Sequence, residues 1–258
     1  MTVDFNTKEI NTWCPGCPNF MILASVKKAL AELRLKKEEV VLTTGIGCHA
    51  KIFDYIDIGG IYSLHGRPIP TAIGIKLGNP KLKVLAFAGD GDTYSEGISH
   101  FIHACRYNAD INLVVHDNQT FALTTGQATA TSQQGFKTKA EPFGEIHKPL
   151  NPIKLALVSG ATFVARANAK DIQGTAEILV EAIKHKGFSF VEIIQNCLQF
   201  NLDMNLLDKL IYKIENKKPD MNKAMDLASE WDYNSQKGKI PIGILYKEER
   251  KTFEDNLR

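Results

Sequence analysis

The stretch KVLAFAGDGD, residues 83–92, decides the fold of this chain. Its uninterrupted apolar residues predict a buried strand, and the pattern that follows predicts a helix from Glu96 to Tyr107. Glycines at the carboxyl end of a buried strand let backbone N–H groups approach a ligand closely, and the next helix offers its N-terminus to an anion. A diphosphate fits this description.

Two carboxylates beside a phosphate site need a cation, and their oxygen atoms suit Mg²⁺, for which Asp90 is the first predicted ligand. A second buried strand, 111–116, is followed by Asn118, with 26 residues (92–117) between Gly91 and Asn118. One helix and one strand fill that gap, so the two strands can lie side by side with their carboxyl ends at one edge. Gly-Asp-Gly-Asp also occurs in ordinary turns. The conjunction with Asn118 makes the prediction of a cation site specific.

The same strand and helix rhythm continues in both directions along the chain. A helix begins at Asn19, its expected N-cap, with apolar residues recurring every three or four positions. Further strands are predicted at 40–44, 162–165 and 188–194, and further helices at 70–77, 171–186 and 221–231. Such alternation predicts an α/β fold, a parallel sheet flanked by helices.

Two segments depart from this rhythm. Residues 118–152 are rich in Thr, Gln, Gly and Pro, and a loop of that length predicts an active-site role. After Cys197 the composition shifts to Asn, Asp and Lys. We therefore expect a binding domain over 1–200 and a C-terminal extension over 201–258, which packs on that domain or on a partner subunit.

Composition excludes several classes of protein. The 258 residues suffice for a full core. A net charge of +2, from 31 basic and 29 acidic residues, argues against a nucleic-acid or membrane-surface binder. The apolar runs are too short for a signal peptide or a spanning helix, so we expect a cytoplasmic protein.

Five cysteines remain to be explained in such a chain. The number is odd, and a reducing cytosol disfavours disulfides, so metal or redox chemistry is the leading question. Cys105 lies on a predicted helix among apolar residues, which is typical of a buried cysteine that packs as a small apolar side chain.

Several motifs, taken together, resemble a known family. Gly-Asp-Gly with a later Asn is similar to the diphosphate-binding motif of thiamine diphosphate enzymes, in which Mg²⁺ is held by positions that correspond here to Asp90, Asn118 and the backbone carbonyl of Thr120. WCPGC (13–17), GIGC (45–48), LHGR (64–67) and LTTGQ (123–127) together resemble the β subunit of 2-oxoacid:ferredoxin oxidoreductases. The resemblance implies the thiamine diphosphate-binding fold.

The resemblance also implies a [4Fe–4S] cluster with four thiolate ligands. The matching cysteines are Cys14, Cys17, Cys48 and Cys197. The same four residues could hold a structural zinc ion, and spacing alone does not choose between the two metals. Electrons from a thiamine site of this kind must pass to a redox-active group, which favours the cluster over zinc.

Other residues are carried over on the same resemblance. Lys51 would face the substrate carboxylate. Contacts to the cofactor would come from three segments: Ile46, Gly47, Cys48 and His49; Gly91 and Asp92 at the diphosphate; and Ala122 and Leu123 at the ring. Pro18 and the pair Phe121-Ala122 depart from the usual family residues, so the backbone near the cluster and the ring can differ slightly. His65 and Arg67 receive no role.

The implied reaction is oxidative decarboxylation of a 2-oxoacid, pyruvate or 2-oxoglutarate, to acyl-CoA and CO₂, with electrons passing through the cluster to ferredoxin. The carboxylate that activates the thiamine ring would come from an α subunit, so the chain alone is expected to be inactive. Two alternatives remain: a zinc-stabilised nucleotide or thiamine diphosphate binding module without activity, and a thiamine diphosphate decarboxylase without redox chemistry.

Overall fold

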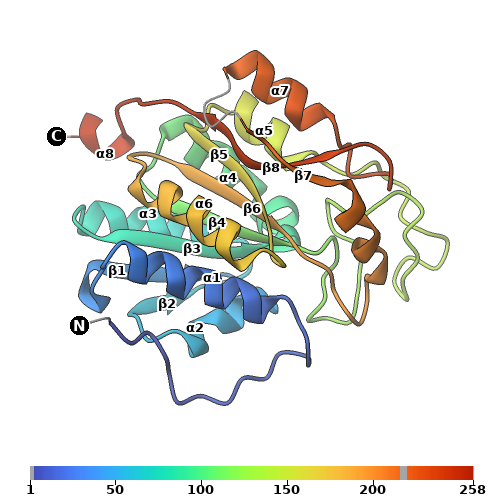
Figure 1. Ribbon diagram of the computed structural model, residues 1–258, viewed down its shortest axis with the longest axis horizontal. Coiled ribbons are helices and arrows are strands. Elements are labelled where there is room, and N and C mark those ends of the chain that lie inside the picture. The colour runs from blue at the N-terminus through green and yellow to red at the C-terminus, as the bar shows by residue number, and fades with distance from the viewer. Residues whose placement is uncertain (1–2, 216–219, 258) are drawn as a thin grey trace.

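In the computed structural model, which describes residues 3–215 and 220–257, an eight-stranded sheet forms the centre of the molecule (Figure 1). Its order is β2-β1-β3-β4-β6-β5-β8-β7, and the first six strands are parallel. β8 runs antiparallel to β5, and β7 is parallel to β8. The strands are β1 Val40–Thr44, β2 Gly60–Tyr62, β3 Lys83–Gly89, β4 Asn112–Asp117, β5 Phe163–Asn168, β6 Ser189–Ile194, β7 Ile211–Lys213 and β8 Ile240–Lys247. The predicted α/β fold with a mostly parallel sheet is confirmed.

Helices cover both faces of the sheet, and an apolar core lies on each side. One core involves α1 (Asn19–Glu32), α2 (Ile52–Tyr55) and α6 (Ile172–Lys184); α1 and α6 lie in front of the sheet in Figure 1. The other core involves α3 (Pro68–Gly78), α4 (Ile98–Tyr107), α5 (Pro152–Val158) and α7 (Met221–Ser229). A short helix α8 (Phe253–Asn256) follows β8.

The connections after β1 and β3 leave the sheet in opposite directions. β1 leads through α2 to β2 at the edge, whereas β3 leads through α4, on the other face, to β4. In an open α/β sheet, a ligand crevice forms beyond the carboxyl ends of strands at such a switch point. β3 and β4 are adjacent, with Gly89 opposite His116, as the spacing of the motifs predicted.

Local differences from the sequence-based expectation have identifiable causes. Pro18, not Asn19, is the N-cap of α1, because Asn19 turns its amide inward and places Oδ1 2.8 Å from Nδ1 of His116. α4 begins at Ile98 because Gly91–Glu96 forms a π-helical turn. α5, absent from the prediction, begins at an Asn151 side chain that accepts a hydrogen bond from the Lys154 N–H.

The last part of the chain packs against the same sheet. β8 pairs with β5, and α7 contacts α5 and β8. Tyr233, just beyond α7, is fully buried and donates a hydrogen bond of 2.6 Å to Glu192, which also pairs with Arg166 at 2.7 Å. Removing one partner from such a buried ion pair is costly, so this cluster fastens the C-terminal residues to β5 and β6.

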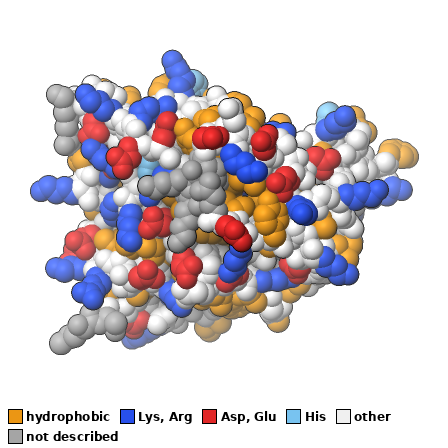
Figure 2. Space-filling view, turned by 45° about the horizontal axis from the view of Figure 1, so that its top comes forward, with side chains coloured by type: hydrophobic (Ala, Val, Ile, Leu, Met, Phe, Trp, Pro, Cys, Tyr) orange, Lys and Arg blue, Asp and Glu red, His pale blue; other side chains and the backbone are white. Residues whose placement is uncertain are grey.

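The molecular surface carries mixed charge. Figure 2 shows lysine and arginine side chains interspersed with acidic ones over the visible face. None of the helices in the described part of the chain combines the length and apolarity that crossing a membrane requires.

A buried histidine, His185, makes the free energy of unfolding depend on pH. Nε2 of His185 lies 2.8 Å from Oγ1 of Thr162, and burial lowers the pKa of His185 to about 4. An unfolded histidine has a pKa of about 6.5. Between these values the unfolded chain binds more protons, so the free energy of unfolding falls as the pH is lowered through this window. Between pH 7 and pH 5, we expect the Tm of the parent chain to fall by about 3 °C more than the Tm of His185→Gln. Equal slopes in thermal unfolding would contradict this role.

Candidate functional site

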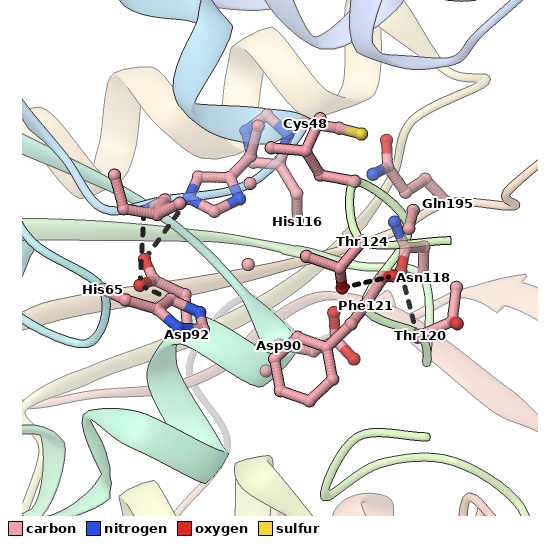
Figure 3. Close-up of a pocket in the computed structure, with 17 residues that line it drawn as sticks. Cys48, His65, Asp90, Asp92, His116, Asn118, Thr120, Phe121, Thr124 and Gln195 are labelled. Atoms are coloured by element: carbon pink, nitrogen blue, oxygen red, sulfur yellow. Dashed lines mark hydrogen bonds and ion pairs between the residues drawn. The ribbon is translucent and has the colours of Figure 1, made fainter. Parts of the chain in front are cut away.

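A pocket opens at the carboxyl ends of β1, β3, β4 and β6, at the switch point of the sheet (Figure 3). Its volume is about 100 Å³. Ligand pockets commonly measure about 300–1,000 Å³, so these residues enclose only part of a ligand of cofactor size. The lining residues are Ile46, Gly47, Cys48, His49, His65, Gly89, Asp90, Gly91, Asp92, His116, Asn118, Thr120, Phe121, Ala122, Leu123, Thr124 and Gln195.

The predicted Mg²⁺ ligands lie together in this pocket. Asp90 directly follows β3, and Asn118 directly follows β4. Oδ2 of Asp90 accepts hydrogen bonds from the hydroxyls of Thr129 (2.5 Å) and Thr131 (3.0 Å). Burial raises the pKa of the Asp90 carboxyl, so the charged form needs stabilisation that a bound cation would supply.

The backbone after β4 turns sharply so that Thr120 returns to the pocket. Gln119 has a φ of 55°, and the N–H of Thr120 donates to Oδ1 of Asn118 at 3.0 Å. Asn201 fixes the turn from outside by donating to the carbonyl of Asn118 at 3.1 Å. A carboxylate, an amide oxygen and a backbone carbonyl are hard oxygen donors, so the residues present fit Mg²⁺.

Two glycines near the pocket lie directly against neighbouring side chains. A Cβ on Gly45 would lie 1.7 Å from the Asp92 carboxylate, and one on Gly91 would lie 2.1 Å from the ring of Phe121. Phe121, a departure from the usual family residue, therefore packs directly on the glycine next to Asp90. Glycine is therefore required at both positions by the close packing of these neighbouring side chains.

The Asp92 carboxylate faces loops rather than the open pocket. It is 1% exposed, and its Oδ1 accepts hydrogen bonds from the N–H groups of Gly66 (2.6 Å) and Ile46 (3.4 Å). Its Oδ2 lies 3.3 Å from Nε2 of His49 without making a hydrogen bond. A contact of Asp92 with a diphosphate is therefore possible through its main chain and not through its side chain.

The pocket residues that were not among the predicted site residues are His65, Gly89, His116, Phe121, Thr124 and Gln195. His116 lies within the β4 pattern that predicted a plain buried strand, and its buried Nε2 has no hydrogen-bond partner among the described residues. Gln195 directly follows β6, at the edge of the sheet where ligands bind. Its position at the end of a predicted buried strand is the feature of the sequence that indicates a pocket residue. His65 lines the pocket, whereas the Arg67 guanidinium donates to the carbonyls of Gly66 and Glu96, away from it.

The structure brings four cysteines into one neighbourhood from three parts of the chain. Cys14 and Cys17 form a turn before α1, Cys48 follows β1, and Cys197 follows β6. Burial, followed by the neighbouring thiols, raises the pKa of Cys48 to about 11. The Trp13 indole N–H donates to the Cys48 carbonyl at 2.6 Å and so ties the N-terminal turn to the β1 loop. Cys48 also lines the pocket, at the top of Figure 3.

The four thiols do not form a ready single-ion site in the described part of the chain. Within residues 3–215 and 220–257, no three or more His, Cys, Asp or Glu side chains are arranged to hold a single metal ion. A zinc ion needs its sulfur ligands at about 2.3 Å. A [4Fe–4S] cluster likewise requires four thiolate ligands, so both metals would draw on the same four cysteines. This finding does not bear on the proposed Mg²⁺ site, because only one of its three donors is a His, Cys, Asp or Glu side chain.

The remaining predicted residues occupy distinct places. Lys51 does not line the pocket, and its ammonium donates to the Thr12 hydroxyl at 3.0 Å, near Cys48. Ala122 and Leu123 do line it. Leu123 is 46% exposed, so it is not a core residue. Cys105 lies on α4 and is fully buried in the core, as predicted.

Comparison with known proteins agrees with this geometry. Residues 45–193 match the family model of the C-terminal TPP binding domain of thiamine pyrophosphate enzymes, and residues 203–258 match the family model of the C-terminal part of the pyruvate ferredoxin oxidoreductase beta chain. The 2-oxoacid:ferredoxin oxidoreductase subunit beta of Saccharolobus solfataricus is 42% identical over 259 residues, covering 93% of this chain and 83% of the relative. The chain belongs to the β subunits of the 2-oxoacid:ferredoxin oxidoreductases.

Other members of the family extend the likeness. The 2-oxoglutarate synthase subunit KorB of Archaeoglobus fulgidus is 41% identical over 185 residues, which cover 72% of this chain and 69% of the relative. A solved 2-oxoglutarate:ferredoxin oxidoreductase from Magnetococcus marinus, with 2-oxoglutarate, coenzyme A and succinyl-CoA bound, superimposes with a TM-score of 0.92 at 34% identity. The match covers 98% of this chain and 87% of that one. The predicted family, its thiamine diphosphate-binding fold and its enzyme class are confirmed for this β subunit.

Proposed function

We propose that this β subunit, together with an α subunit, catalyses thiamine diphosphate-dependent oxidative decarboxylation of a 2-oxoacid to acyl-CoA and CO₂, with ferredoxin as electron acceptor. Cys48 carries the proposal, because it lines the pocket of Asp90 and Asn118 and also neighbours Cys14, Cys17 and Cys197. One residue thus joins the cofactor pocket to the group of thiols proposed to hold a [4Fe–4S] cluster. A cluster held there would adjoin the pocket and would accept electrons from it.

Each part of the chain has a defined task in this proposal. Asp90, Asn118 and the Thr120 carbonyl would hold Mg²⁺ and with it the diphosphate, and the main chain at Gly91 would approach the phosphate oxygens. Bound thiamine diphosphate supplies the electron sink for loss of CO₂. Leu123, half-exposed in the pocket, offers an apolar surface for the cofactor ring. Lys51 lies beside Cys48, where an ammonium would attract the substrate carboxylate.

The small pocket supports the requirement for an α subunit. With about 100 Å³ formed by this chain, much of the cofactor would be covered from outside it. The activating carboxylate for the thiamine ring would belong to that partner. β8, which pairs with β5, and α7, which contacts β8, would keep the loops beyond β4 and β6 in place. The names of the relatives, which include subunits of 2-oxoglutarate synthases, make 2-oxoglutarate and pyruvate the first substrates to test.

Metal analysis tests the proposal against a zinc-stabilised binding module. The anaerobically purified chain is expected to contain about four irons and acid-labile sulfide. One zinc per chain without iron would contradict the proposal. A panel of pyruvate, 2-oxoglutarate, branched-chain and aryl 2-oxoacids with the α-containing complex would then identify the substrate, by acceptor reduction with coenzyme A present.

A further inference from the structure

A short turn, residues 197–201, begins at the last of the four cysteines proposed to hold the cluster. The N–H of Asn201 donates to the Cys197 carbonyl at 3.2 Å, which closes the turn. The turn starts three residues after β6, at the edge of the sheet where the pocket opens. Because this hydrogen bond holds the two ends together, a constraint on Cys197 also restrains Asn201.

The Asn201 end of the 197–201 turn holds the loop that carries the proposed Mg²⁺ donors. The Asn201 side chain is 7% exposed, and its Nδ2 donates to the Asn118 carbonyl at 3.1 Å. That carbonyl directly precedes Gln119, which has a φ of 55°. A residue other than glycine keeps such a left-handed backbone only where neighbouring contacts hold it. Asn201 therefore helps to place Asn118 and the Thr120 carbonyl, two of the three proposed donors.

The residues between the two ends pack on other parts of the site. A Cβ added to Gly126 would lie 2.8 Å from the ring of Phe200, so this ring packs against the loop 121–127, which lines the pocket. A Cβ added to Gly16 would lie 3.5 Å from Cδ1 of Leu198. The 197–201 turn thus contacts the N-terminal cysteine turn, the pocket loop and the Mg²⁺ loop.

We propose that the 197–201 turn couples binding of the cluster to binding of thiamine diphosphate, with Asn201 as the positioning residue. A cluster bound through Cys197 would fix one end of the turn, and Asn201 at the other end would then hold the Asn118 carbonyl in place. Coupling between two sites is reciprocal, so the cofactor would also help to retain the cluster. This inference rests on the two sites of the proposed function above.

Affinity measurements on the complex with the α subunit test the positioning role. Isothermal titration with thiamine diphosphate, at one fixed Mg²⁺ concentration, gives Kd for complexes with matched iron content. Asn201→Leu removes the donor to the buried Asn118 carbonyl, so we expect Kd to rise about fivefold or more. Asn201→Gln keeps an amide donor and should bind more tightly than Asn201→Leu. Asn205→Leu is the matched control, since Asn205 is exposed and contacts Lys170, and it should leave Kd unchanged.

Comparison of complexes with and without the cluster tests the coupling itself. Removal of iron with a chelator should raise Kd of the parent complex about fivefold or more, whereas in Asn201→Leu the same removal should change Kd little. A role of Asn201 in folding alone would leave this ratio unchanged. The rate of iron release to the chelator is the second measurement, which needs no cluster-free complex. Bound thiamine diphosphate should slow this rate in the parent and not in Asn201→Leu.

Three results would overturn the proposal. The first is parent-like Kd for Asn201→Leu, and the second is an equal loss of affinity in Asn205→Leu. The third is a parent complex in which the cluster leaves Kd unchanged and thiamine diphosphate does not slow iron release, a result that counts even if Asn201→Leu fails to fold. A parent complex that holds no iron, or that binds no thiamine diphosphate, would instead contradict the proposed function.

Discussion

Asp90→Asn is expected to abolish Mg²⁺-dependent binding of thiamine diphosphate, with a rise in Kd of about 100-fold or more. The substitution removes the one carboxylate among the three proposed Mg²⁺ donors, and Mg²⁺ in such sites depends on a carboxylate together with substrate phosphates. The amide oxygen can still accept hydrogen bonds from Thr129 and Thr131, so the local fold should survive. It also removes a buried charge, so thermal stability without metal should not fall.

Titration calorimetry of the α-containing complex with thiamine diphosphate, at saturating Mg²⁺, measures this effect. Asp57→Asn is the matched control because that carboxylate is 55% exposed and pairs with Lys37 at the surface. Parent-like affinity in Asp90→Asn would show that Asp90 does not hold the metal.

Cys48→Ser is expected to eliminate the iron–sulfur cluster and, with it, 2-oxoacid-dependent reduction of ferredoxin. Four thiolates are required by such a cluster, and Cys48 also lies between the other thiols and the cofactor pocket. We expect iron and labile sulfide to fall below about a tenth of the parent content. Because the thiols join the N-terminal turn to the ends of β1 and β6, loss of the cluster should also lower Tm.

Cys105→Ala is the control for this variant, since Cys105 lies on α4, is buried in the core and does not line the cofactor pocket. It should keep the full iron content. A Cys48→Ser enzyme that retains its iron would contradict the ligand assignment. One that loses iron but still produces acyl-CoA at the parent rate would favour a decarboxylase without redox chemistry.

Local patterns were sufficient to predict the main layers of this fold. Long apolar runs such as 83–88 identified the central strands, and the 26-residue gap before Asn118 placed β4 beside β3. Elements of three or four residues, such as β2 and α2, carry too few residues for a periodic signal. The π-helical turn 91–96 could not be predicted from the sequence either, because no apolar spacing marks it and the Asp92 side chain within it is held by a distant part of the chain.

The proposed site residues come from motifs that carry their own chemistry. Asp90, Asn118 and the four cysteines are such positions, and the structure brings them to one edge of the sheet. The role of Asp92 could not be predicted, because its partners Gly66 and Ile46 lie 26 and 46 residues away in the chain. His116 was missed for a similar reason: its partner Asn19 is 97 residues distant.

Reconstitution tests the central claim most directly. The purified chain, alone and with its α subunit, is assayed anaerobically for CO₂ release and acceptor reduction with pyruvate or 2-oxoglutarate, thiamine diphosphate, Mg²⁺ and coenzyme A. Our account predicts no turnover by the chain alone and coupled formation of CO₂, acyl-CoA and reduced ferredoxin by the complex. Full turnover by the isolated chain, or a complex that fails to reduce ferredoxin with every 2-oxoacid, would contradict it.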